Sequence, residues 1–267
     1  MEERKQENLV WKVLFCVLAI VLLVLGVIFL KDIYQQKEAE QSYEDLVEAE
    51  NELVEEMVIP EEQRDVLQEL GIEIPEKAID FEALLQENED IYAWIYIPGV
   101  EVDYPILQHP TDDAYYLNHN LDGSSGLPGV IYTETVNSKD FMDPHTVIYG
   151  HNMNNGTMFG ALHDYEDSQV FEDNQYFFIY TPEKIFVYQI FAAYEYNAVH
   201  LIYNFDLENP DIYQNYLDQI FEIRDINSNI RRDVEVDAED HIVTLSTCVR
   251  GKKNMRYLVQ GVLLNDE

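Results

Sequence analysis

The cysteine near the carboxyl end of this chain is the residue best suited to covalent chemistry. Cys248 follows an alternating segment, 241–247, that predicts a strand, and Arg256 opens the next predicted strand, 256–264. The connection between them, 249–255, is short and polar, which predicts a hairpin. In a hairpin the end of one strand lies beside the start of the next. We therefore expect the Cys248 thiol and the Arg256 guanidinium to be neighbours at one rim of a sheet.

A guanidinium beside a thiol has a direct chemical use. A permanent cation favours thiolate over thiol, and the same group can donate hydrogen bonds to the oxyanion formed when a thiolate attacks an amide carbonyl. Arg250, Lys252 and Lys253 add local positive charge, although the whole chain carries a net charge of -36. Arg250 is a second candidate for the arginine role. The alternative is that Cys248 is a small packing residue and the basic residues form a solvated hairpin tip.

Amide cleavage by a thiolate also needs an acid that protonates the departing amine, and histidine is the usual choice. Of the 7 histidines, His151 follows a predicted strand, 146–149, and a turn at Gly150. We therefore expect its imidazole at a sheet rim rather than in the core. His145, at the start of the same strand, is the fallback. The alternative for any of these histidines is a purely structural role.

Composition and charge exclude two other classes of site. The chain contains no HExxH, no CxxC pair and no DxDxDG loop, so its many carboxylates are predicted to solvate the surface. We expect no metal and no other cofactor. A net charge of -36 repels phosphates, which excludes nucleic acid as a partner.

An apolar segment near the amino terminus predicts a membrane anchor. Residues 9–30 include a single charged residue, Lys12, and the segment is long enough to cross a bilayer as a helix. It ends without the small-residue cleavage site of a signal peptide. Basic residues before it and acidic residues after it predict a cytoplasmic tail, 1–8, with the rest of the chain outside the cell. We expect a single-pass protein of the cell membrane.

The chain beyond the anchor divides into an acidic helical stalk, 31–78, and a predicted catalytic domain, 79–267. Short runs of Val, Ile, Tyr and Phe separated by Gly, Pro, Asn and Asp are typical of an all-β barrel or sandwich. A late amphipathic helix interrupts them, with Asn209 as its cap and Pro210 in its first turn. The predicted strands are 93–97, 129–132, 146–149, 176–180, 184–194, 241–247 and 256–264.

Several motifs resemble those of the sortases, and of class B sortases in particular. The resemblance covers about residues 79–264 and leaves only the anchor and the stalk outside it. An arginine, Arg256, also opens the strand after the cysteine motif, as in that family. The segments that carry the resemblance are TLSTC (244–248), VIYGHNM (147–153), TMFGAL (157–162), 79–108 and 115–123.

The resemblance implies a fold and a reaction. The fold is mainly β, an eight-stranded sortase-type barrel with amino-terminal helices and a helix inserted before the strand that carries Cys248. The reaction begins when Cys248 attacks a sorting-signal peptide of a secreted surface protein or pilin and forms a thioacyl enzyme. His151 serves as general acid and base, and Arg256 binds the substrate or its oxyanion. An amine acceptor, such as a peptidoglycan precursor, then resolves the intermediate.

The same resemblance places Leu117, Ser246, Ile202 and Tyr203 along the peptide groove. The alternative is that they are ordinary packing residues near the inserted helix. Two other functions stay open, a cysteine peptidase that releases peptide to water and an inert surface adhesin or scaffold. The product formed in the presence of an amine distinguishes the peptidase, and the reactivity of the thiol distinguishes the adhesin.

Overall fold

A closed β-barrel forms the body of the protein. The computed structural model describes residues 2–51, 61–75, 77–207 and 209–265. The strands are β1 (Ile91–Ile97), β2 (Val102–Leu107), β3 (Ile131–Thr133), β4 (His145–Tyr149), β5 (Tyr176–Tyr180), β6 (Ile185–Asn197), β7 (Asn229–Ile230), β8 (Ile242–Val249) and β9 (Lys252–Leu263). The helices are α1 (Glu2–Asn51), α2 (Glu61–Leu70), α3 (Phe81–Glu87), α4 (Ser168–Asp173), α5 (Leu201–Asn204) and α6 (Pro210–Glu222), with 3-10 helices η1 (Tyr115–Leu117) and η2 (Phe159–Glu166).

The sheet runs in the order β5-β1-β2-β3-β4-β8-β9-β6-β7, and β6 also pairs with β5, which closes the ring. The two-residue β7 only extends the edge of β6, so the closed ring has eight strands. The pairs β2–β3 and β4–β8 are parallel, and the other neighbours are antiparallel. The eight-stranded barrel predicted from the sequence is confirmed, including a helix, α6, that precedes the strand carrying Cys248.

All seven predicted strands are present, but β2 and β7 were not predicted. Pro105 lies within β2 and has no backbone N–H, which argues against a strand at the sequence level. In the structure Pro105 pairs with Trp94 of β1, while β3 joins the other edge of β2 only at Ile106 and Leu107. The proline therefore stands where β2 has a single neighbouring strand.

Helix α6 forms for the reasons expected from its sequence and covers one outer face of the barrel. The Asn209 side chain accepts hydrogen bonds from the backbone N–H groups of Asp211 and Ile212, and Pro210 occupies the first turn. The apolar face of α6 is buried against β4, β6, β8 and β9, which contribute to one cluster with it. That face comprises Tyr213, Tyr216, Leu217 and Ile220.

A buried polar network crosses the strands beneath α6. His145 of β4 lies 2.7 Å from the Thr244 hydroxyl of β8, and Gln260 of β9 donates to the same hydroxyl at 2.8 Å. Gln260 also accepts from Tyr194 of β6 at 3.0 Å and donates to Tyr216 of α6 at 2.9 Å. Because each of these groups is buried, a shift in strand register would leave polar atoms without partners.

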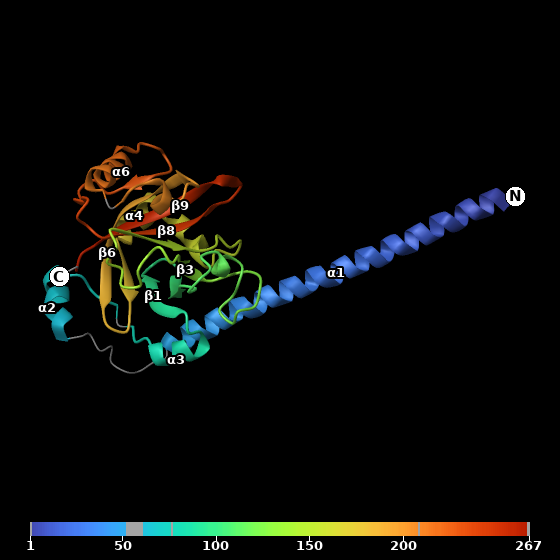
Figure 1. Cartoon of the computed structure of the whole chain (residues 1–267), viewed down its shortest axis with the longest axis horizontal. Helices are drawn as coiled ribbons and strands as arrows, with labels where there is room; N and C mark the ends of the chain where they lie inside the picture. The colour runs from blue at the N-terminus through green and yellow to red at the C-terminus, as the bar shows by residue number, and fades with distance from the viewer. Residues whose placement is uncertain (1, 52–60, 76, 208, 266–267) are drawn as a thin grey trace.

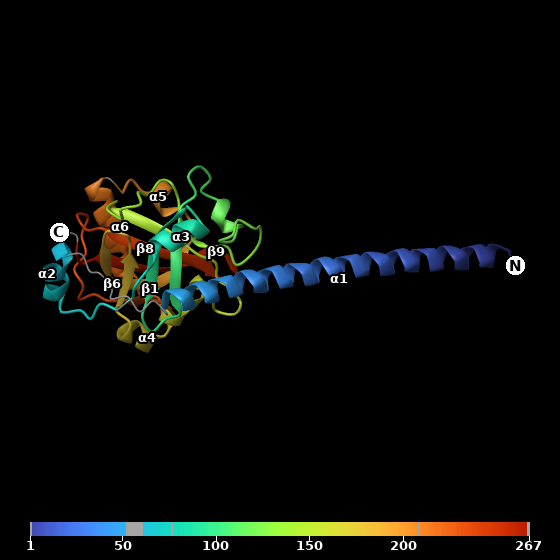
Figure 2. The same ribbon diagram turned by 90° about the horizontal axis from the view of Figure 1, so that it is seen from below.

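Helix α1 is continuous through the apolar segment 9–30 and on to Asn51. It is long and apolar enough to cross a membrane, with a mean hydropathy of 3.5 in its most apolar window. Its free end projects away from the barrel, and α2 lies on the opposite side of the barrel (Figures 1 and 2). Residues 52–60 and 76 of the predicted stalk lie outside the described residues.

The other end of α1 is docked on the barrel. The Tyr43 side chain is buried, and its hydroxyl donates to the Gly129 carbonyl at 2.9 Å. Lys77 donates to Asn51 at 2.7 Å and to Asp103 of β2 at 2.9 Å, so a buried cation joins the end of the helix to the sheet. This part of the acidic segment is therefore packed against the barrel and contributes to its core.

His145 gives the fold a testable pH dependence. Burial lowers its pKa from about 6.5 to about 3, so the folded protein holds it neutral while the unfolded chain protonates it below about pH 6.5. Acidification from pH 7 to pH 5 should then lower the free energy of unfolding by about 2 kcal/mol through this group. Denaturant titrations at both pH values should show that His145→Gln lacks this component.

His241→Gln is the matched control because it removes another imidazole near the start of β8 and leaves His145 and its partners in place. The control should keep the component that His145 contributes. Equal pH dependence in the parent and in His145→Gln would contradict the assignment.

Candidate active site

Strand pairing brings the three predicted catalytic side chains to one rim of the barrel. Cys248 of β8 is in register with Arg256 of β9, which is the neighbour relation expected from the hairpin. On the other edge of β8, Tyr149 of β4 is in parallel register with Ser246. His151, just beyond the end of β4, and Cys248 each stand two residues beyond that pair, so they reach the same height at this rim.

The hairpin differs from the prediction in its connection. The segment 249–255 was predicted to be a loop, but β9 begins at Lys252 and only Arg250 and Gly251 form the turn. Gly251 has a φ of +77°, which suits a residue without Cβ. Residues 252–255 belong to β9 because Lys252 pairs with Val249 of β8 and Met255 pairs with Asn197 at the end of β6. Just beyond β6, the Ala198 N–H donates to the Asn254 carbonyl at 2.9 Å. Tertiary pairing here outweighs a polar, loop-like composition.

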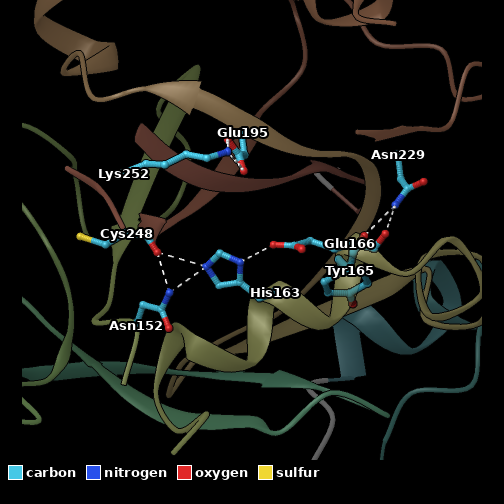
Figure 3. A network of polar contacts seen from close by, with 8 residues as sticks. All are labelled: Asn152, His163, Tyr165, Glu166, Glu195, Asn229, Cys248 and Lys252. Carbon is cyan, nitrogen blue, oxygen red and sulfur yellow. Dashed lines mark hydrogen bonds and ion pairs between the residues drawn. The ribbon is translucent and has the colours of Figure 1, made fainter. Parts of the chain in front are cut away.

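Cys248 presents its thiol to solvent while its carbonyl is held from behind. The residue is exposed, and no hydrogen bond to its sulfur occurs within the described ranges. The Asn152 side-chain amide donates to the Cys248 carbonyl at 2.7 Å, and Nε2 of His163 lies 3.1 Å from the same oxygen. Figure 3 shows the sulfur pointing away from these two side chains. The thiol is thus accessible to a substrate.

His151 is oriented by backbone atoms of η1 and of the loop that holds Gly129. Its Nε2 lies 2.6 Å from the Leu117 carbonyl, and since a carbonyl only accepts, that nitrogen carries a hydrogen. In the neutral ring Nδ1 is then the basic nitrogen. The buried Gly129 backs the ring so closely that a Cβ there would lie 3.0 Å from Cδ2 of His151. Tyr43 of α1 holds the carbonyl of this same glycine.

Arg256 is half-buried and is available for a ligand. Within the described part of the chain its guanidinium makes one hydrogen bond, to the Met255 carbonyl at 3.1 Å. Burial raises the pKa of Tyr132, and the charge of Glu134 raises this pKa further. The Arg256 guanidinium lowers the same pKa, whereas Cys248 raises it. The guanidinium and the thiol therefore share one electrostatic environment. Arg250, the alternative candidate, lies in the turn and has no such register with Cys248.

The four predicted groove residues separate into different environments. Ser246 is buried and lines a cavity of about 110 Å³ together with Arg256. Leu117 is exposed and supplies the carbonyl that orients His151. Tyr203 is 64% exposed, and its ring centroid lies 4.2 Å from that of His200, which also lines the cavity.

The segment that holds Ile202 and Tyr203 forms a short helix whose first residue packs into the core under α6. Residues 201–204 form α5, and Leu201 is buried in the cluster under α6. Ile202 is partly buried and packs against the same cluster. The described lining of the cavity includes Val199 and Leu201 but neither Ile202 nor Tyr203.

Two other expectations concern histidines and basic residues. His145 is 3% exposed and takes part in the polar network of the core, so it cannot reach a substrate as the fallback acid. Lys252 forms an ion pair with Glu195 at 2.6 Å, which neutralises part of the positive charge of Arg250, Lys252 and Lys253 (Figure 3).

Among the described residues there is no group of three or more His, Cys, Asp or Glu side chains able to hold a metal ion.

Asn152, His163 and Glu166 were missed by the sequence analysis. His163 belongs to η2, and its Nδ1 lies 2.6 Å from Glu166, three residues further along the chain. The i, i+3 spacing of a histidine and a carboxylate was the only signal in the sequence. Nothing in that spacing indicates that the pair would meet Cys248, which is 85 residues away.

Comparison with known proteins places this geometry in a family. The model of the sortase domain matches residues 95–264. The chain belongs to the sortase family. A sortase B of Listeria monocytogenes is 34% identical over 181 residues, which cover 66% of this chain and 71% of that protein. This chain is therefore a cysteine transpeptidase, and the similar proteins are class B sortases.

Solved structures agree with this assignment. Sortase B of Clostridium perfringens matches with a TM-score of 0.61 and 29% identity over 69% of this sortase and 99% of that chain. A Staphylococcus aureus sortase B–substrate complex matches with a TM-score of 0.64 and 25% identity over 88% of this sortase and 100% of that chain.

Replacement of Gly129 by alanine should displace the His151 imidazole. Gly129 has a φ of +70°, and the added Cβ would lie 3.0 Å from Cδ2 of His151 and 3.0 Å from the Tyr116 carbonyl. We expect changed His151 side-chain signals in NMR spectra and a loss of about 1 to 3 kcal/mol in the free energy of unfolding.

Gly123→Ala is the control, since Gly123 has a similar φ of +77° but only Tyr115 Oη at 3.7 Å near the new Cβ. It should show the cost of backbone strain without a change at His151. Identical His151 spectra in the two variants would refute the proposed contact.

Proposed function

We propose that this sortase cleaves a carboxyl-terminal sorting motif of secreted proteins through a thioacyl intermediate on Cys248 and transfers the protein to an amine. The observation that supports this is the register of Cys248 with Arg256 of β9, together with the position of His151 two residues beyond the Tyr149–Ser246 pair, level with Cys248. An accessible thiol, a cation in register with it and an imidazole just beyond the end of the neighbouring strand are the groups that thiolate acyl transfer needs.

In the proposed first step, the Cys248 thiolate attacks the carbonyl carbon of the scissile peptide bond. Arg256 favours the thiolate and donates hydrogen bonds to the oxyanion of the tetrahedral intermediate. Protonated His151 gives a proton to the departing amine, the C–N bond breaks, and a thioester forms. In the second step an acceptor amine attacks the thioester, His151 takes the proton of that amine, and the thiolate of Cys248 is released.

The substrate is proposed to be an extended peptide with a motif of the type Asn-Pro-x-Thr or Leu-Pro-x-Thr. The similarity to a sortase B–substrate complex supports binding of such a substrate on this rim. Ser246 beside Arg256, and Leu117 beside His151, flank the three proposed catalytic residues and are suited to line its path. Ile202 and Tyr203 lie further out on α5, where they would contact residues of the peptide before the motif.

The setting of the reaction is proposed to be the outer face of a cell membrane. We propose a cytoplasmic tail, 1–8, a transmembrane anchor, 9–30, an acidic helical segment, 31–78, and a catalytic domain, 79–267. The apolar stretch of α1 supports the anchor, and the basic residues before it support the orientation. Anchoring raises the effective concentration of secreted substrates and of an amine acceptor such as a peptidoglycan precursor or another pilin.

The catalytic assignment predicts a sharp difference between two arginines. The full-length protein in detergent micelles is incubated with a panel of quenched sorting peptides and an amine nucleophile. Cys248→Ala should lower kcat by a factor of at least about 10⁴. Arg256→Lys keeps the charge but loses the planar fork of donors, and should lower kcat/KM by about 10- to 100-fold.

Arg250→Lys is the matched control and should stay within about twofold of the parent, because Arg250 is exposed in the turn. Inactivity of the parent on every peptide, or undiminished cleavage by Cys248→Ala, would refute the proposal.

The products distinguish transfer from hydrolysis. With saturating amine, mass spectrometry should find the amide product in excess over the free carboxylate, since the acceptor intercepts the thioester. A carboxylate product alone would establish the peptidase alternative. An inert adhesin would instead leave the Cys248 thiol resistant to alkylation at neutral pH, whereas an activated thiol reacts readily.

A further inference from the structure

Beyond the three proposed catalytic residues, a second histidine contacts the nucleophile strand. His163 comes from η2, which packs against the end of β8 and the start of β9. Its side chain is 20% exposed, and its ring stacks on Tyr257 with a centroid distance of 4.8 Å. Tyr257 pairs with Thr247, the residue before Cys248. The ring is thus packed directly behind the proposed nucleophile.

The polar contacts of His163 connect Glu166 and Asn152 with the backbone carbonyl of Cys248. Nδ1 lies 2.6 Å from the Glu166 carboxylate, and Nε2 lies 2.9 Å from the Asn152 amide nitrogen and 3.1 Å from the Cys248 carbonyl (Figure 3). The Asn152 amide nitrogen itself lies 2.7 Å from that carbonyl. Two side chains, one of them tied to a carboxylate, therefore converge on a single backbone oxygen.

These side chains stand where the β4–β8 ladder ends. The last backbone bond between these segments runs from the Gly150 N–H to the Ser246 carbonyl at 3.1 Å. Two residues further along each segment, beyond the end of β4, the partner of the Cys248 carbonyl is the side chain of Asn152. On the edge of β8 that faces β4, Cys248 is therefore held by side chains, while its other edge stays paired with the backbone of β9.

Hydrogen positions give His163 a defined role in either protonation state. A carboxylate only accepts, so Nδ1 carries a hydrogen. In the neutral ring Nε2 then accepts one N–H of Asn152, whose other N–H is directed to the Cys248 carbonyl. In the imidazolium Nε2 donates to that carbonyl itself. Both arrangements fix the Cys248 peptide plane, and that plane sets the direction of the thiol.

We propose that His163, supported by Glu166 and acting with Asn152, is a positioning residue that aims the Cys248 thiol during acyl transfer. The inference rests on the proposed role of Cys248 as nucleophile. Since His163 contacts the Cys248 backbone but not the sulfur, and is proposed not to contact the substrate peptide, its removal should lower the rate of the chemical step and leave substrate binding nearly unchanged. Displacement of a reacting atom by about 1 Å costs up to about 100-fold in rate.

The test uses two amide side chains of different length. In His163→Gln the amide reaches the place of Nε2 and can still serve Asn152 and the Cys248 carbonyl. In His163→Asn it reaches only the place of Nδ1. We expect His163→Gln to keep kcat within about threefold of the parent and His163→Asn to lose about 10- to 100-fold, both with KM changed by less than about twofold.

His241→Gln, at the opposite end of β8, is the control and should match the parent. The double variant His163→Asn with Asn152→Ala should lose less than the product of the two single losses, because both residues act on one oxygen. Thermal unfolding of every variant identifies any loss due to unfolding alone.

Equal kcat in His163→Gln and His163→Asn, or a change confined to KM, would overturn the inference. That outcome differs from failure of the proposed function, in which the parent cleaves no peptide or Cys248→Ala remains active. Only a parent that is active, and inactivated by Cys248→Ala, makes the comparison of His163 variants a test of positioning.

Discussion

The register of β8 between β4 and β9 is the constraint on which the rest of this site depends. Direct contacts between the side chains of Cys248, Arg256 and His151 would not by themselves keep these residues together. Their relation follows from backbone pairing, Cys248 with Arg256 on one edge and Ser246 with Tyr149 on the other. A slip by one residue would turn the thiol to the other face of the sheet.

The barrel protects this register from within. The buried network from His145 through Thr244 and Gln260 reaches strands on both sides of β8 and ends on α6. Each member of the network has its hydrogen-bond partners in only one strand register. The polar core therefore specifies this register, whereas an apolar core would tolerate a shift of one strand past another. The helix inserted before β8 therefore does more than cover apolar surface, since Tyr216 belongs to the polar network that fixes the register. The same strands carry this network in the core and the proposed catalytic residues at the rim.

Much of this arrangement could be predicted from the sequence because it is local. A hairpin juxtaposes Cys248 and Arg256 whatever surrounds it, and a strand followed by a turn brings His151 to a rim. What depends on distant partners could not be predicted. The strand character of 252–255 depends in part on the end of β6, which pairs with Met255, and the meeting of His163 with the Cys248 carbonyl comes from the path of η2. The strand β2 was hidden by Pro105, whose position at a half-free edge is a tertiary property.

The continuous helix α1 has a consequence for geometry at a cell surface. From the end of the apolar stretch at Leu30 to the docking point at Tyr43 the helix advances about 20 Å at 1.5 Å per residue. Because no break interrupts the helix, a bilayer around residues 9–30 would hold the barrel at a fixed height above the membrane. Acceptors whose reactive amine extends that far from the hydrocarbon layer would be within reach, and shorter ones would not. A single helix would then select acceptors by how far their amine extends from the membrane, before any contact with the active site.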